Sequence, residues 1–139
     1  MNLKKVSAGV ILTDGEVFLT GIPAGKKNKR DIPKGGIDEG EKPIEAAIRE
    51  VKEETNLDIR ASQLEDLGVF KYTQDKDLHL FLMYTKKLPP VKAMKCTSTF
   101  EMYGKQIPEM VGFEYLTIEN VNKLYTAMAP IVKKIMSAL

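Results

Sequence analysis

The segment from Gly35 to Leu57 constrains the fold more than any other part of the chain, because it reads as a glycine-containing loop followed by a two-faced helix. Pro43 suits the first helical turn, where its missing N–H is no loss, and nearby acidic residues favour the positive end of a helix. Asn56 tolerates the left-handed backbone conformation that often closes a helix. We therefore predict a helix that begins near residue 42 and ends near residue 55.

The two faces appear when residues are placed about 100° apart around the helix axis. An apolar stripe that can pack on a sheet consists of Ile44, Ala47, Ile48 and Val51. The carboxylate face, at positions i, i+3 and i+4, consists of Glu50, Glu53 and Glu54. The remaining sector, which we expect to be solvated, holds Glu45, Arg49 and Lys52.

Three neighbouring carboxylates destabilise a helix by mutual repulsion. A bound Mg²⁺ or Mn²⁺ ion would reverse that effect, since these hard cations prefer oxygen ligands, and Mg²⁺ commonly completes its shell with water and substrate phosphates. The carboxylate face therefore indicates metal-assisted phosphate chemistry. The alternative is a merely solvated acidic face, which is common on helices.

The spacing of the residues around this helix decides between the two interpretations. The segment fits the pattern G-x5-E-x7-R-E-U-x-E-E-x-G-U, in which U is aliphatic, except that Asn56 stands where the pattern has glycine. The matching residues are Gly35, Glu41, Arg49, Glu50, Val51, Glu53, Glu54 and Leu57. The segment resembles the Nudix box of hydrolases that cleave nucleoside diphosphates linked to another moiety. Because Asn tolerates the same backbone conformation as glycine, the departure concerns the last helical turn rather than the chemistry.

The resemblance implies a metal site and a mechanism. Glu50, Glu53 and Glu54 would hold one to three Mg²⁺ or Mn²⁺ ions together with the backbone carbonyl of Lys34, next to a Gly35-Gly36 loop that approaches the phosphates. Water would attack a phosphorus atom in line. We expect Glu53 to take the proton of that water, with Glu50 as the alternative.

Two further residues of the box receive supporting roles. Arg49 would hold a box carboxylate in place, either Glu41 or Glu53, instead of facing solvent. For Glu41 a structural role and a position close to the metal are equally compatible with the pattern. The resemblance also leaves room for a non-catalytic Nudix domain that binds a nucleotide or a protein. Such domains usually lack box glutamates, and none is missing here.

A carboxylate outside the box completes the predicted site. Glu109 precedes an aromatic-rich segment that resembles RNA 5′-pyrophosphohydrolases and diadenosine tetraphosphate hydrolases, in which a glutamate at this place reaches the metal cluster. The alternative is an exposed glutamate before a strand. The entry to the box, Pro33-Lys34-Gly35, looks like the corresponding segment of the same subgroup, whereas ADP-ribose pyrophosphatases tend to have Pro-Ala-Gly there. Residues 4–10 look more like the dinucleoside and inositol polyphosphate branches of the family. The favoured substrate is a dinucleoside polyphosphate; the alternatives are an RNA 5′ end, a nucleoside triphosphate and ADP-ribose.

Substrate contacts are expected outside the box. A run of positive charge just before it consists of Lys26, Lys27, Lys29, Arg30 and Lys34. Beside a phosphate site this run could guide a polyphosphate or an RNA 5′ end, although such runs are also typical of solvated loops. Tyr103 and Phe100, in a predicted loop, are candidates for stacking on a base.

Length and composition agree with a small enzyme. The chain has 139 residues, 43% hydrophobic and 29% charged, which predicts a single domain over residues 1–139. A net charge of +2 is too small for general attraction to nucleic acid. Without an apolar run of transmembrane length or a signal-peptide core, we expect a cytoplasmic protein with no membrane partner. The single cysteine, Cys96, excludes an internal disulfide, and a homodimer is compatible with the sequence.

The rest of the chain reads as alternating strands and connections. Hairpins are predicted around the turns at 13–16 and 74–77, and the apolar run Leu80 to Tyr84 predicts a strand buried on both faces. The predicted strands cover residues 6–12, 17–19, 67–73, 78–85 and 113–116, with a loop at 86–95 and helices over 118–125 and 129–139. We therefore predict an α/β (α+β) fold with helices on both faces of a mixed β-sheet, which is the α/β/α sandwich that the Nudix resemblance implies.

Overall fold

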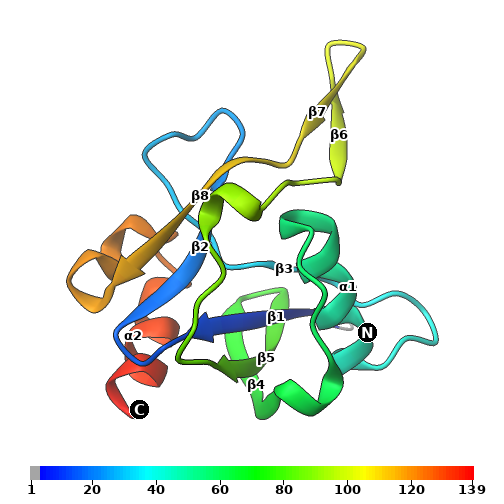
Figure 1. Ribbon diagram of the computed structural model, residues 1–139. Coiled ribbons are helices and arrows are strands. Elements are labelled where there is room, and N and C mark those ends of the chain that lie inside the picture. The colour runs from blue at the N-terminus through cyan, green and yellow to red at the C-terminus, as the bar shows by residue number, and fades with distance from the viewer. Residues whose placement is uncertain (1–3) are drawn as a thin grey trace.

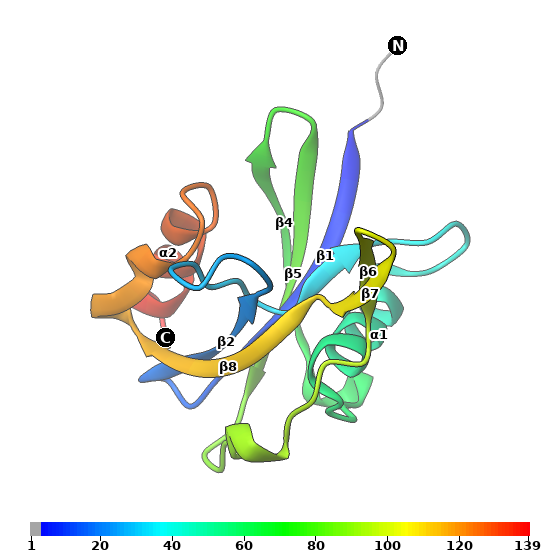
Figure 2. The ribbon, with the colours of Figure 1, turned by 90° about the horizontal axis from the view of Figure 1, so that it is seen from above.

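The computed structural model describes residues 4–139 and has one mixed sheet with helical segments on both sides (Figures 1 and 2). The sheet strands are β1 (Lys5–Thr13), β2 (Val17–Pro23), β3 (Lys34–Gly36), β4 (Glu65–Thr73), β5 (Lys76–Tyr84) and β8 (Met110–Thr117). Their order is β4-β5-β1-β2-β8, and β3 pairs with β1. Strands β1 and β5 are parallel, whereas the other pairs are antiparallel. This mixed sheet confirms the predicted fold class.

Two α-helices cover the opposite faces of the sheet, α1 (Pro43–Thr55) and α2 (Ala129–Ser137). Side chains alternate along β5, so that Phe81 packs with the apolar stripe of α1, whereas Leu80 and Leu82 belong to the cluster that includes α2. These three residues are all buried. The prediction of a strand covered on both faces is therefore confirmed for residues 80–82, whereas Met83 is half-buried and Tyr84, at the end of β5, is exposed.

Helix α1 begins and ends as the sequence predicted. Pro43 occupies its first turn, and the backbone N–H of Lys42 donates to Glu45 Oε1 at 2.8 Å. Asn56 adopts a left-handed conformation with φ of 65°, and its N–H donates to the carbonyl of Lys52 at 2.9 Å. The short asparagine side chain thus replaces the glycine of the pattern without loss of the helix cap.

Three segments differ from the prediction. Residues 34–36 form β3 because they pair with Ser7–Gly9 of β1. The predicted loop around Tyr103 is a hairpin of β6 (Thr99–Met102) and β7 (Lys105–Pro108) that extends from the body in Figure 1. Tyr103 and Gly104 have φ of 52° and 76°, the left-handed pair of a tight hairpin turn, but Tyr-Gly is a weak sequence signal for it. The segment predicted as a helix at 118–125 is a 3₁₀-helix, η3 (Ile118–Lys123).

Two short 3₁₀-helices lie in the connections, η1 (Ala61–Gln63) and η2 (Val91–Ala93), the second within the predicted loop at 86–95. Among the helices of residues 4–139, none is both long and apolar enough to cross a membrane.

Candidate metal centre

The carboxylate of Glu50, on α1, lies directly against the backbone of β3 at Gly35. A Cβ atom built on Gly35 would overlap the carboxylate of Glu50. Because Gly35 carries no side chain, the carboxylate of Glu50 can reach the backbone of β3. The structure therefore brings the glycine loop and the box carboxylates together, as the sequence predicted.

The carboxylates of Glu50 and Glu54 are buried, with residue exposures of 9% and 3%. Glu54 Oε1 is one of two buried side-chain atoms of the described residues that have no hydrogen-bond partner. Burial, the charge of Glu50, a hydrogen bond to Glu50 and the charge of Glu109 raise the pKa of Glu54 to about 10. A buried carboxyl in this setting retains a proton at neutral pH unless a cation takes its place.

Arg49 lies at the centre of an ion-pair network on the solvent side of the carboxylates. Its guanidinium donates to both oxygens of Glu41 at 2.8 and 3.0 Å, to Glu50 Oε1 at 2.8 Å and to the carbonyl of Gly36 at 2.8 Å. Its distance to Glu53 Oε2 is longer, 3.3 Å. The hydrogen bond from Arg49 lowers the pKa of Glu41 to about 2. Arg49 thus connects the loop, Glu41 and α1, and Glu41 is bound to Arg49 rather than to the buried pair.

Glu109 reaches the same region through hydrogen bonds of the backbone. The carbonyl of Glu53, at the end of α1, accepts N–H groups of Thr97 and Ser98 at 2.7 and 3.1 Å. Ser98 in turn accepts the N–H of Glu109 at 3.1 Å, and the Glu109 carbonyl accepts the N–H of Ala24 at 3.1 Å. These bonds hold Glu109 between α1 and the end of β2, where its charge acts on Glu54.

The donor set fits a hard divalent cation. No three His, Cys, Asp or Glu side chains in residues 4–139 converge on one point that could hold a metal ion by themselves. Mg²⁺ is usually bound by one or two carboxylates plus water and substrate phosphates, and the buried pair Glu50 and Glu54, with its unpartnered oxygen, supplies that number. Glu53 has a side chain that is 40% exposed, so it is accessible to water beside this pair.

The positively charged run before the box is only partly free for a substrate. Arg30 donates to the carbonyls of Lys27 and Lys29, both at 2.8 Å, and pairs with Glu114 at 3.3 Å, so its role as a substrate contact is not supported. The ammonium of Lys34 faces Asp31 at 3.2 Å rather than solvent. Lys27 is exposed, and the ammonium of Lys29 lies 6.0 Å from the ring centre of Tyr125.

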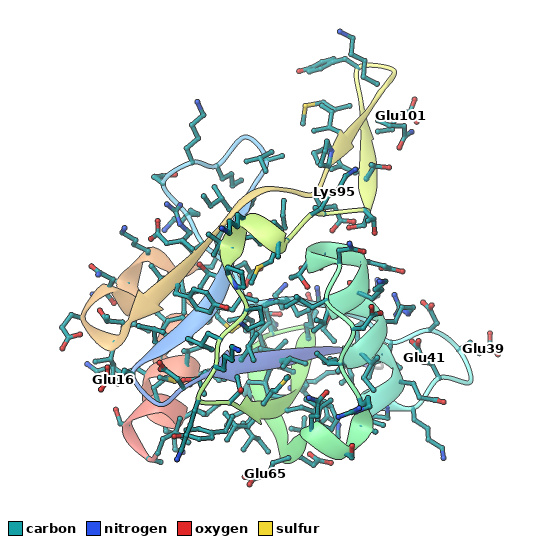
Figure 3. The ribbon with its side chains drawn as sticks, in the orientation of Figure 1. Glu16, Glu39, Glu41, Glu65, Lys95 and Glu101 are labelled. Carbon is teal, nitrogen blue, oxygen red and sulfur yellow. The ribbon has the colours of Figure 1, made fainter. Side chains whose placement is uncertain are left out.

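The structure separates Tyr103 from the candidate centre. Tyr103 is 97% exposed at the turn of the β6–β7 hairpin, the projecting arm that carries Glu101 in Figure 3. Two residues that the sequence did not single out, Asp31 and Tyr125, instead share a hollow with Glu109 and Phe100. Burial raises the pKa of the Asp31 carboxyl, and the neighbouring Lys34 ammonium opposes that shift. The one sequence signal for Asp31 is a charged residue directly before the apolar Ile32-Pro33.

Comparison with known proteins identifies the family of this chain. The NUDIX domain family matches residues 3–138, nearly the whole chain. The chain belongs to the Nudix hydrolase family. A relative of this Nudix protein, an uncharacterised 17.7 kDa protein of enterobacteria phage T4 from the e-segB intergenic region, is 38% identical over 127 residues, which cover 81% of this chain and 82% of the relative.

Solved Nudix structures share the fold at low sequence identity. The chain matches an Ap4A hydrolase of C. elegans with a TM-score of 0.62 and 21% identity over 94% of this chain and 96% of that one. It matches a bifunctional NMN adenylyltransferase/ADP ribose pyrophosphatase of Francisella tularensis, solved with AMP and a Mn ion, with a TM-score of 0.68 and 17% identity. That match covers 95% of this chain but 41% of the Francisella protein, so the chain spans less than half the length of that relative.

Proposed function

We propose that this Nudix protein hydrolyses a phosphoanhydride bond in a nucleoside diphosphate linked to another moiety, with Mg²⁺ or Mn²⁺ and with a dinucleoside polyphosphate as the favoured substrate. The observation that carries the proposal is the buried oxygen of Glu54 that has no hydrogen-bond partner. The charges of Glu50, which lies against Gly35, and of Glu109 both raise the pKa of Glu54. An oxygen buried without a donor is costly in a protein interior. A cation bound there removes that cost and provides a site for phosphate.

Glu50 and Glu54 would hold the cation, with the Lys34 carbonyl and Glu109 as further ligands. When bound, the cation neutralises the negative charge of the phosphate oxygens in the transition state. Glu53 takes the proton of the attacking water, because its side chain is 40% exposed and its contact with Arg49 is long. Glu50 is the weaker candidate for the base, since Arg49 donates to it at 2.8 Å. Arg49 positions the carboxylates and does not touch the reacting atoms.

The substrate assignment is supported by the loop before the box and by the charge around it. Lys27 and Lys29 remain able to meet a polyphosphate chain, whereas Arg30 is held by the loop itself. The C. elegans structure is named an Ap4A hydrolase, the Francisella protein an ADP ribose pyrophosphatase, and a similar E. coli structure a dihydroneopterin triphosphate pyrophosphohydrolase. An RNA 5′ end, a nucleoside triphosphate and ADP-ribose are therefore the competing substrates.

A substrate panel tests the proposal. The purified protein is incubated with Mg²⁺ and either diadenosine tetraphosphate, diguanosine tetraphosphate, ADP-ribose, nucleoside triphosphates or 5′-triphosphorylated RNA, and products are separated by chromatography. We expect hydrolysis that EDTA abolishes, with a dinucleoside tetraphosphate as the best substrate. Glu53→Gln should lower kcat by roughly a hundredfold or more, whereas Glu65→Gln, at an exposed position of β4, should leave it unchanged. Lack of hydrolysis of every compound would favour a binding domain instead.

A further inference from the structure

A hollow of about 360 Å³ lies beside Glu109, between the β2–β3 loop, β6 and the segment that follows η3. Its size is within the range of about 300–1,000 Å³ that is typical of small-molecule sites. A larger hollow of about 630 Å³ lies between η2 and β8, but neither Glu109 nor any box glutamate lines it. Of the two, only the smaller hollow is lined by a residue of the candidate metal centre, Glu109.

The chemistry of the smaller hollow comes from three residues, Asp31, Phe100 and Tyr125. Asp31 is 7% exposed, and its backbone pairs with Gly21 through hydrogen bonds of 2.8 and 3.0 Å. Its Oδ1 accepts the N–H of Ile32 at 3.0 Å, and its Oδ2 lies 3.2 Å from Lys34 Nζ. Because each carboxylate oxygen can accept two hydrogen bonds, both oxygens retain one acceptor position. Through these contacts and its ion pair with the Lys34 ammonium, the Asp31 carboxylate is a fixed, buried hydrogen-bond acceptor.

The two aromatic residues provide apolar faces in the same hollow. Phe100 is half-buried although it belongs to the projecting hairpin, and Tyr125 is half-buried next to Lys29. Stacking on aromatic side chains favours any nucleobase regardless of its identity. The hydrogen-bonding edge of the base must then be read by polar groups, and Asp31 is the buried polar group at this place.

We propose, on the basis of the proposed function, that this hollow binds one base of the nucleotide substrate and that Asp31 selects guanine. Guanine presents two adjacent donors, N1–H and the N2 amino group, to which a carboxylate can accept in parallel. Adenine presents its amino group beside the acceptor N1, which would face a carboxylate oxygen. A site built to accept from a donor rejects a ligand that places an acceptor there.

Binding of GMP and AMP with Mg²⁺, measured by calorimetry, tests the subsite without hydrolysis, because a monophosphate contains no phosphoanhydride bond. We expect GMP to bind roughly tenfold or more tightly than AMP, the usual scale for discrimination by a paired hydrogen bond. Asp31→Asn should abolish this preference, because the amide presents a donor to N1–H or N2–H. Asp75→Asn, in the exposed turn between β4 and β5, should preserve it.

A second variant keeps the test informative if Asp31→Asn fails to fold. Phe100→Leu should weaken GMP and AMP equally, by about fivefold or more, whereas Tyr84→Leu, at an exposed tyrosine of β5, should weaken neither. Equal affinity of the wild type for GMP and AMP, or a preference that survives Asp31→Asn, would overturn the proposal.

The binding and hydrolysis experiments distinguish a failure of the proposed function from a failure of the proposed base subsite. If GMP is preferred through Asp31 but no member of the substrate panel is hydrolysed, the subsite stands and the hydrolase proposal fails. If diadenosine and diguanosine tetraphosphate are hydrolysed with equal kcat/KM and GMP and AMP bind equally, the hydrolase proposal stands and the subsite fails.

Discussion

Glu54→Gln should stabilise the metal-free protein while it removes activity. The pKa of Glu54 is raised from 4.5 to about 10 in the folded chain, so the folded state retains a proton that the unfolded chain releases above pH 4.5. The free energy of unfolding then falls with rising pH by about 1.4 kcal/mol per pH unit, and at pH 7 the loss is on the order of 3 kcal/mol. Glutamine has no proton to lose and can still donate to Glu50, so this loss disappears in the variant.

Urea unfolding in EDTA at several pH values between 4 and 9 measures the effect. At pH 4 the wild type and Glu54→Gln should be similarly stable, and by pH 7 the variant should be more stable by on the order of 3 kcal/mol. Added Mg²⁺ should stabilise the wild type and not the variant. Glu65→Gln, labelled in Figure 3 away from α1, should match the wild type throughout. A variant that is less stable at pH 8, or a difference that does not change with pH, would refute the reasoning.

Two further substitutions test the geometry around the buried pair. Gly35→Ala should lower kcat/KM at least tenfold and the free energy of unfolding by about 1–3 kcal/mol, because the new methyl group would overlap Glu50. Gly36→Ala is the matched control, since a Cβ atom there would meet nothing within 4 Å. Equal effects of the two substitutions would contradict the close approach of Glu50 to Gly35. Arg49→Lys should lower the free energy of unfolding in urea by about 1–2 kcal/mol and should lower kcat, because a lysine cannot reproduce the forked hydrogen bonds to Glu41 and Glu50. A wild-type free energy of unfolding together with a wild-type kcat would show that the Arg49 network has no function.

The sequence predicted the box helix well because all of its signals lie within one continuous segment. Pro43 and Asn56 determine its ends through local backbone chemistry, and the spacing of the glutamates determines their face. The strands of the central sheet were similarly evident, since their apolar residues are buried. The β6–β7 hairpin was missed because it projects from the body, so its residues lack a buried face that would impose alternation, and its turn is Tyr103-Gly104 rather than Asn-Gly.

The site outside the box depends on contacts between distant segments. Asp31 was missed because its significance comes from Lys34 on one side and from Tyr125 and Phe100, far along the chain, on the other. The location of Glu109 depends on backbone hydrogen bonds with Ser98 and Ala24, which any residue except proline can form and which leave no trace in composition or periodicity. Arg30 shows a second limit of the sequence, because a charge that reads as free there is bonded to carbonyls of its own loop and to Glu114 of β8.

Binding of Mn²⁺ in the absence of nucleotide, followed by electron paramagnetic resonance, tests the central claim most directly. The wild-type protein and Glu65→Gln should bind Mn²⁺ with equal affinity, and Glu54→Gln should bind it at least tenfold more weakly, because it replaces a ligand oxygen of the buried pair. Equal affinity of Glu54→Gln and the wild type, or no binding to the wild type, would contradict a metal centre at the carboxylate face of α1.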